Sequence, residues 1–251
     1  MFKSWLSNCL TVLFAFVLTQ NTVIGQIEST KPTGDSFVTT VPAPNPDAWW
    51  TERHAKKLAD LKNTKSVDLL WIGDSITHSW EGSGKDVWDE FYAKRNPFNI
   101  GYSGDRTENV LWRLENGEID GIQPKLIVMM IGTNNTGHRQ DPSEQTVAGI
   151  KAILGRLRHR MAESKILLLG VFPRGENASD RLRVLNDQIN TQLPTLADEE
   201  HIFFLDIGPA FLENKQSTYK ELMPDLLHPN KAGYEVWAKA IEDKIVKLMG
   251  E

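Results

Sequence analysis

The sequence predicts an α/β fold in three αβα layers, with a five-stranded parallel sheet between two layers of helices. Short apolar runs alternate along the chain with longer segments of helical periodicity, five times over. The runs are continuously apolar, as expected of strands that are buried on both faces. Repeated strand–helix alternation is the pattern of parallel sheets. The 251 residues, 40% of them hydrophobic, suit one domain with a large core, and no internal repeat divides them.

The elements follow one another in a regular order. The expected strands are residues 67–72, 97–100, 126–131, 165–171 and 202–206. The expected helices lie around residues 54–61, 87–93, 108–116, 142–163, 179–197 and 229–249. In such a sheet, ligands bind at the carboxyl ends of the strands, so the loops that follow the strands are where functional residues are expected.

The N-terminus is expected to be a secretory signal peptide, residues 1–25. Lys3 precedes an apolar stretch at residues 10–18, and the small residue Gly25 follows. A retained anchor is the alternative, although a membrane span needs about twenty apolar residues. Residues 26–47, rich in Thr, Ser, Pro and Gly, are expected to be a flexible linker before a domain at 48–251. The protein is therefore expected to be exported, to the periplasm or outside the cell, with no stable membrane span after removal of the signal.

Charge and cysteine content exclude several classes of function. The net charge of −5 argues against nucleic acid or acidic membrane surfaces as the main partner. The single cysteine, Cys9, would leave with the signal peptide, which excludes a cysteine nucleophile, a disulfide framework and a thiolate metal site. The histidines lack the spacing of metal ligands, so we expect no metal and no cofactor.

A serine, an aspartate and a histidine are placed as a nucleophilic triad requires. Ser75 follows the first strand directly, and Asp225 and His228 stand before the last helix. A carboxylate three residues from a histidine can hold the imidazole in one tautomer while its other nitrogen faces the serine. Alternatively, Ser75 caps a helix and Asp225 belongs to a surface turn.

The loops after the second and third strands can supply hydrogen-bond donors. Residues 99–105 contain two glycines, and residues 131–135 contain a glycine followed by two asparagines. A glycine N–H and an asparagine amide, together with the backbone N–H of Ser75, would form an oxyanion hole. Ordinary tight turns are the alternative reading of these loops.

These four blocks resemble those of the SGNH (GDSL) hydrolases, matching Ser75, Gly104, Asn134 and His228, with Asp225 as the acidic partner. Further stretches look like the catalytic α subunits of intracellular platelet-activating factor acetylhydrolase, and the likeness spans residues 49–249. The stretches are residues 109–118, 124–125, 132–135 and 173–176.

The resemblance implies a flavodoxin-like fold and a metal-free serine esterase that cuts short acyl esters, acetyl above all. It implies that Ser75 attacks the acyl carbonyl and His228 takes its proton. It also implies that Ser75 N–H, Gly104 N–H and the Asn134 side chain hold the oxyanion. The resembling subunits dimerise, so a homodimer is an expectation as well.

The substrate is less defined than the chemistry. Ile76, Thr133 and Leu227 adjoin the nucleophile, the amide and the base, and they are expected to line a small acyl pocket. The second block departs from the pattern of the resembling subunits, and its residues Tyr102, Ser103 and Arg106 alter the rim of the site. An exported enzyme meets polysaccharides, so acetylated carbohydrate is an alternative to a lipid ester. A catalytically silent carbohydrate-binding module on the same scaffold is the alternative of a different class.

Tryptophans and the remaining histidines are expected to be mainly structural. Four tryptophans are expected to fill the seams between helices and sheet: Trp80, Trp88, Trp112 and Trp237. Trp49 and Trp50 are expected to pack the N-terminal helix, with ligand binding as the alternative. His78 and His138 follow the active blocks closely and either line the pocket or lie in solvated loops.

Overall fold

The computed structural model describes residues 37–214 and 217–251. The predicted signal peptide and the first part of the predicted linker lie outside the described residues. The described residues belong to one compact unit. Among the described residues, no helix has both the length and the apolar character that crossing a membrane requires.

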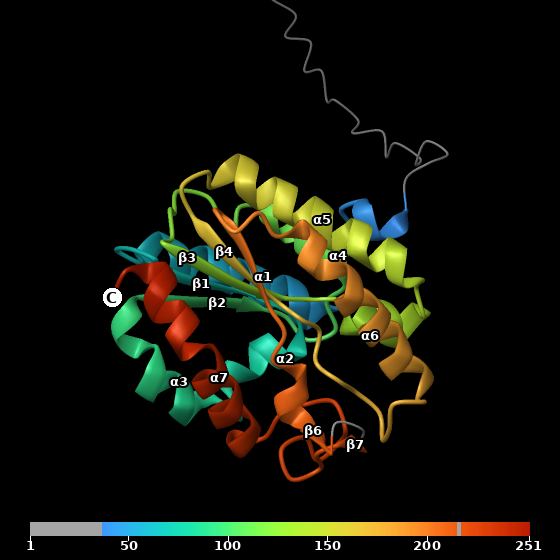
Figure 1. Ribbon diagram of the computed structural model, residues 1–251. Coiled ribbons are helices and arrows are strands. Elements are labelled where there is room, and N and C mark those ends of the chain that lie inside the picture. The colour runs from blue at the N-terminus through green and yellow to red at the C-terminus, as the bar shows by residue number, and fades with distance from the viewer. Residues whose placement is uncertain (1–36, 215–216) are drawn as a thin grey trace, which may run out of the picture. The chain divides into compact units, whose positions relative to one another are not determined.

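Five parallel strands form the central sheet, which confirms the predicted fold class (Figure 1). Their order in the sheet is β2-β1-β3-β4-β5. The strands are β1 Leu69–Gly73, β2 Pro97–Gly101, β3 Leu126–Met130, β4 Lys165–Leu169 and β5 Ile202–Leu205. The chain moves from β1 outward to β2 and then back past β1 to β3. The loops after these three strands therefore meet at one edge of the sheet, where the strand order reverses.

Helices cover both faces of the sheet, as Figure 1 shows. They are α1 Ala48–Asn63, α2 Ser75–His78, α3 Lys85–Phe91, α4 Thr107–Glu115, α5 Ser143–Arg160, α6 Arg181–Gln192 and α7 Lys231–Met249. Helices α1, α4, α5 and α6 share one apolar cluster with the sheet, and α3 and α7 share another.

The alternation of side chains along each strand separates these two clusters. In β1, Leu70 and Ile72 point to the α5 side, whereas Leu69 and Trp71 point to the α7 side. All four are fully buried, which explains why the strands read as continuous apolar runs. Trp80 and Trp237 belong to the α7 cluster, as predicted, and Trp88 and Trp112 pack at the edges of the two clusters.

Several short elements are absent from the sequence-based prediction. Helix α2 has only four residues, and strands β6 Leu212–Glu213 and β7 Ser217–Thr218 form a small antiparallel pair outside the main sheet. A π-helical turn, Asn135–Arg139, follows the third strand. Such elements are too short to produce a periodic pattern in the sequence.

Residues 37–47, the second part of the expected linker, pack against the domain. Thr39 is fully buried, and its hydroxyl donates to the Gln145 carbonyl at 2.6 Å. Its own carbonyl accepts from the Thr107 hydroxyl at 2.9 Å. Ala43 N–H donates to the Glu108 carbonyl at 3.1 Å, and Ala43 O accepts from the Asn109 amide at 3.0 Å. This segment is therefore fastened across α4 and α5, unlike a free linker.

Candidate active site

Ser75 stands where β1 passes directly into α2, at the carboxyl edge of the sheet. Asp74 caps the helix, because its carboxylate accepts from the Ile76 N–H at 3.0 Å. The end of β2 lies against the same helix. A Cβ at Gly101 would come within 2.4 Å of the His78 nitrogen, so only glycine allows this approach. The serine is thus held on a short, tightly packed turn at the place that the strand order favours for a ligand.

Ser75, His228 and Asp225 form one hydrogen-bonded chain. Ser75 Oγ lies 2.9 Å from His228 Nε2, and His228 Nδ1 lies 2.6 Å from Asp225 Oδ2. The carboxylate partner assigns the proton to Nδ1, which leaves Nε2 free to accept the serine proton. The structure therefore brings Ser75 together with an aspartate and a histidine that lie about 150 positions further along the chain. The distances between them are those that proton transfer requires.

The turn that carries Asp225 and His228 is closely constrained. Asp225 Oδ1 accepts from the backbone N–H groups of Leu227 at 3.0 Å and of His228 at 2.7 Å. Leu226 between them has φ +62°, a left-handed conformation that is costly for a leucine. Its carbonyl accepts from the Gly175 N–H at 3.0 Å. These contacts fix the carboxylate against its own backbone and aim the imidazole at Ser75.

Two carboxylates near the serine have opposite pKa shifts. Partial burial works against ionisation of Asp225, but hydrogen bonds from the backbone and imidazole of His228 outweigh it and lower the pKa. Complete burial raises the pKa of Asp74 to about 6. The hydrogen bond from the Ile76 N–H and the nearby charges of His228 and Arg174 act in the opposite direction but are weaker. Asp225 is thus an anion beside the imidazole over the whole neutral range.

Gly104 and Asn134 present hydrogen-bond donors at the same edge. Gly104 has φ +78°, which turns its N–H in a direction that other residues seldom adopt. The Asn134 amide donates one hydrogen to the Asp105 carbonyl at 3.0 Å, which leaves its second hydrogen available. Tyr102 N–H donates to the Gly73 carbonyl at 3.1 Å and joins the loops after β1 and β2. Among the described residues, the backbone N–H groups of Ser75 and Gly104 have no acceptor. These three groups therefore have donor capacity left, as the predicted oxyanion hole requires.

The residues expected to line an acyl pocket differ in their exposure. Ile76 is 1% exposed, and its side chain belongs to the apolar cluster on the α7 side. Thr133 is also 1% exposed, and its hydroxyl accepts from Arg174 at 3.1 Å and from Asn186 at 3.3 Å. Leu227 is the partly exposed one of the three. Ile76 and Thr133 are therefore buried inside the domain, and of the three residues only Leu227 presents appreciable surface.

Arg174 is a residue near the site to which the sequence assigned no role. Its guanidinium donates to the Thr133 carbonyl at 2.8 Å, directly before Asn134, and packs so closely on Gly137 that a Cβ there would touch it. Burial lowers the pKa of Arg174, although the nearby carboxylates of three aspartates act to raise it: Asp180, Asp74 and Asp225. In the sequence, segment 173–176 carries only a resemblance to a family. A guanidinium that holds one backbone carbonyl leaves no periodic signal in a sequence.

His78 and Ser103 form a second polar contact beside the serine. His78 Nδ1 lies 3.0 Å from Ser103 Oγ, and the Trp49 ring stacks on the imidazole at 6.3 Å between centroids. Burial lowers the pKa of His78 to about 4, and Arg53 adds to the effect, so the ring is neutral at pH 7. A hollow of about 310 Å³ beside them is lined by His78, Ser79, Glu81, Gly82 and Ser103.

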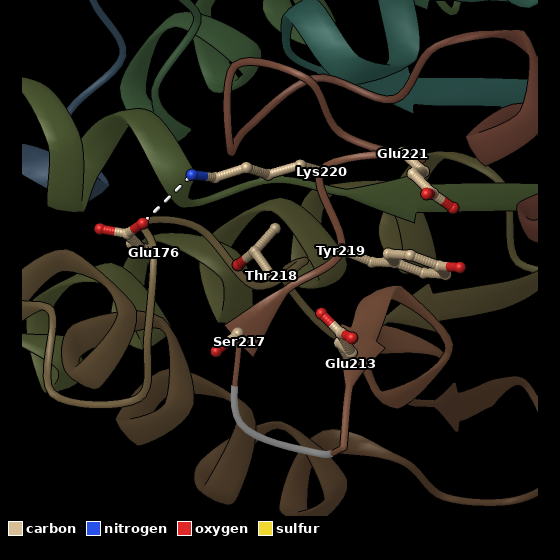
Figure 2. Close-up of a pocket in the computed structure, with 7 residues that line it drawn as sticks. All are labelled: Glu176, Glu213, Ser217, Thr218, Tyr219, Lys220 and Glu221. Atoms are coloured by element: carbon tan, nitrogen blue, oxygen red, sulfur yellow. Dashed lines mark hydrogen bonds and ion pairs between the residues drawn. The ribbon is translucent and has the colours of Figure 1, made fainter.

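A separate cavity of about 430 Å³ lies at the β6–β7 pair, as Figure 2 shows. Glu176, Glu213 and Glu221 line it together with Lys220, which pairs with Glu176 at 3.1 Å. Ser75, Asp225 and His228 are not among its lining residues. It adjoins the loop that leads to the histidine but is not part of the serine site.

Comparisons with known proteins agree with this geometry. Residues 71–236 match the model of the GDSL-like lipase/acylhydrolase family. The chain is 34% identical to human platelet-activating factor acetylhydrolase IB subunit alpha1 over 206 residues, 82% of this chain and 86% of the relative. It is also 34% identical to the rat alpha2 subunit over 209 residues, 82% of this chain and 87% of the relative.

Solved structures share the fold at lower sequence identity. A putative acylhydrolase from Bacteroides fragilis has a TM-score of 0.67 at 19% identity, covering 82% of this chain and all of that one. An acetylxylan esterase from Geobacillus stearothermophilus has a TM-score of 0.58 at 22% identity, covering 75% and 97%.

Hydrolases that act on esters use a serine that is hydrogen-bonded to an imidazole, and here this pair lies at the carboxyl edge of an α/β sheet. The family match covers about two thirds of the chain and includes Ser75 and His228. The chain belongs to the GDSL-like lipase/acylhydrolase family.

Proposed function

We propose that the protein is a serine esterase that hydrolyses short-chain acyl esters, acetyl esters first, through an acyl-serine intermediate. The observation that carries the proposal is the chain from Ser75 Oγ to His228 Nε2 at 2.9 Å and from His228 Nδ1 to Asp225 Oδ2 at 2.6 Å. The likeness to subunits named acetylhydrolases, at 34% identity, supports the acetyl preference.

The proposed reaction has two stages. Ser75 Oγ attacks the ester carbonyl while His228 Nε2 takes the serine proton, and Asp225 stabilises the resulting imidazolium. The carbonyl oxygen, now negative, accepts from Ser75 N–H, Gly104 N–H and the free hydrogen of Asn134. The C–O bond to the alcohol breaks, and the alcohol leaves with the proton from His228. Water then attacks the acyl-serine, His228 again takes and returns a proton, and the carboxylic acid is released.

Replacement of the serine tests this mechanism. We expect Ser75→Ala to abolish hydrolysis of p-nitrophenyl acetate, whereas Ser83→Ala, at an exposed serine in the following turn, should keep the wild-type rate. Activity that survives in Ser75→Ala would overturn the serine mechanism. A wild-type protein that cleaves no ester would favour the binding-module alternative.

Acyl-chain length tests the short-chain preference separately. We expect kcat/KM on p-nitrophenyl acetate to exceed that on the octanoate, because the relatives at 34% identity are named acetylhydrolases. Equal or faster hydrolysis of the octanoate contradicts the acetyl preference and leaves the serine mechanism intact.

We propose acetylated carbohydrate as a second candidate for the ester. The supporting observation is the polar hollow at His78 and Ser103, whose lining contains no aliphatic side chain, together with Trp49, which is 38% exposed and stacks on His78. A sugar can stack a C–H face on an indole while its hydroxyls bond to polar groups such as His78 and Ser103.

Release of acetate decides between sugar and lipid. Acetylated xylan and an acetylated phospholipid would be compared, each with wild type and Trp49→Ala. For a sugar ester we expect xylan to be preferred and Trp49→Ala to raise KM on xylan alone. Val184→Ala, at an equally exposed apolar residue on α6, is the matched control. Preferential release from the phospholipid overturns the carbohydrate proposal.

We also propose that the protein is exported, on the basis of the signal-peptide pattern in residues 1–25. N-terminal sequencing of the product in a secreting host tests this. A new N-terminus within a few residues of Gly25 is expected, and an uncleaved chain in the cytoplasm contradicts the proposal.

A further inference from the structure

A cluster of charged groups is buried next to the oxyanion donors, on the α5 side of the sheet. Its centre is Arg113, between Asp105 and Glu118, and all three side chains are completely buried. Trp50 and His54 reach it from α1. We call these five residues and Tyr102 the buried charge cluster.

The members of the cluster are joined by hydrogen bonds. Arg113 Nε donates to Asp105 Oδ2 at 2.8 Å, and Nη1 donates to the Ile100 carbonyl at 3.0 Å and to Glu118. The other oxygen of Glu118 accepts from the Tyr102 hydroxyl and lies 2.9 Å from His54 Nδ1. The guanidinium also lies over the Tyr102 ring, 4.0 Å from its centroid. The cluster is therefore rigid, because nearly every polar atom has a fixed partner.

Asp105 connects the cluster to the site. One carboxylate oxygen accepts from Trp50 Nε1 at 2.6 Å and the other from Arg113, so the side chain cannot rotate. The backbone of the same residue is tied to the oxyanion donors. Its carbonyl accepts from the Asn134 amide at 3.0 Å, and its N–H donates to the Tyr102 carbonyl at 3.1 Å, which closes the turn that contains Gly104.

Stability alone is a weak reason for such a cluster. Burying ionised groups carries a desolvation penalty, and well-packed apolar residues can replace a buried ion pair at little cost or with a gain. A network of this kind fixes the positions of its members. A hydrogen-bond donor stabilises an oxyanion best when it is already held in position before the reaction.

We propose that the buried charge cluster positions the oxyanion donors, with Trp50 and Asp105 as positioning residues that act through Asn134. The indole of Trp50 holds the Asp105 side chain, and the Asp105 carbonyl orients the amide so that its second hydrogen faces the reacting carbonyl oxygen. Helix α1, which contributes none of the reacting groups, is thereby part of the catalytic apparatus. The inference rests on the proposed esterase function, because it concerns the oxyanion formed at Ser75.

A double-mutant cycle between Trp50 and Asn134 tests the proposal. Trp50→Phe removes the indole N–H and keeps an aromatic ring against His54 and Tyr102. We expect it to lower kcat on p-nitrophenyl acetate about tenfold with little change in KM, and Asn134→Ala to lower kcat by about 10²–10³-fold. In the Asn134→Ala background, Trp50→Phe should have no further effect, because the group through which it acts is gone.

Trp112→Phe is the matched control. Trp112 packs against Trp50 at 5.3 Å and against His54 at 5.1 Å between ring centroids but has no bond to Asp105. We expect this variant to keep the wild-type kcat. If Trp50→Phe does not fold, Asp105→Asn takes its place in the cycle, because it keeps the backbone carbonyl and loses the charge that pairs with Arg113.

Two results overturn the proposal. One is a kcat for Trp50→Phe equal to that of the wild type. The other is a loss of kcat on Trp50→Phe substitution that is equally large in the wild-type and the Asn134→Ala backgrounds. Either would assign the cluster to stability alone. Ser75→Ala, measured in parallel, separates this from failure of the proposed function. If that variant is inactive and the cycle is additive, only the positioning role is wrong.

Discussion

At the scale of single residues, Asp74 combines a structural contact with an unfavourable charge. Its carboxylate caps α2 through the Ile76 N–H, yet complete burial raises its pKa to about 6. A carboxyl group whose folded pKa lies above its unfolded value contributes stability at low pH, and that contribution is lost as the pH rises through the folded pKa. Asp74 therefore destabilises the protein above about pH 6.

Asp74→Asn is expected to remove this cost. The amide oxygen can still accept from Ile76, and no charge is buried. A rise in pKa from 3.8 to about 6 corresponds to at most about 3 kcal/mol, so unfolding in urea at pH 8 should need up to that much more free energy. At pH 4 the gain should disappear. Asp86→Asn, at an exposed carboxylate, is the control without such a gain. A gain for Asp74→Asn that is equal at both pH values contradicts the assignment.

Asp225 is the residue by which the tautomer of His228 can be tested. Asp225→Asn keeps the shape but can present an N–H to Nδ1, which would move the imidazole proton to the nitrogen that should receive the serine proton. We expect kcat on p-nitrophenyl acetate to fall about 10²-fold or more, with KM nearly unchanged. Asp180→Asn, which caps α6 through the same kind of backbone contact, should keep the wild-type kcat. A loss below tenfold would show that the exposed carboxylate does not control the tautomer.

At the scale of elements, the segment before α1 shows where composition misleads. Residues 37–47 read as linker because they are rich in Pro and Thr and lack periodicity. Thr39 is nevertheless buried, because Gln145 on α5 and Thr107 on α4 supply partners for its polar groups. Composition records which groups need hydrogen bonds, but not whether the folded domain offers them.

Truncation tests the contribution of this segment to stability. A chain beginning at residue 48 should be less stable to urea than one beginning at residue 37 by about 2–6 kcal/mol. The estimate assumes about 0.5–1.5 kcal/mol for each of the four hydrogen bonds that fasten Thr39 and Ala43, with some further apolar burial. The chain beginning at residue 37 serves as the control, and equal stability of the two would mean that the segment acts as a linker in solution.

An element can be predicted from the sequence when it produces an apolar pattern several residues long. The predicted bounds of all five strands lie within two residues of the observed ones, because strands buried on both faces are continuously apolar. The residues of the predicted serine site each follow a strand or precede a helix, where function is expected. The contacts of Asp105 and Arg174 carry no such signal, because they are made through backbone carbonyls. Such contacts depend on tertiary placement and leave no pattern in a single sequence.

At the scale of the whole molecule, one sheet carries two apolar clusters. Leu70 and Ile72 contribute to the cluster on the α5 side, and Leu69 and Trp71 to that on the α7 side, all from β1. Because the same strands form the floor of both clusters, loss of either should unfold the other. Leu157→Ala on α5 and Trp237→Ala on α7 are therefore each expected to shift a single transition, coincident by tryptophan fluorescence and far-UV circular dichroism.

The size of the Trp237 effect depends on which part of the side chain is removed. Its ring is fully buried and packs against Trp80 at 5.0 Å and Phe172 at 4.9 Å between centroids, so Trp237→Ala should cost about 3–5 kcal/mol. Its indole N–H has no acceptor among the described residues. Trp237→Phe loses volume but also removes a buried, unpaired donor, whose desolvation costs about 1–3 kcal/mol. We expect Trp237→Phe to cost less than about 1.5 kcal/mol in urea unfolding. A cost equal to that of Trp237→Ala would mean that the N–H is satisfied in solution, by a buried water.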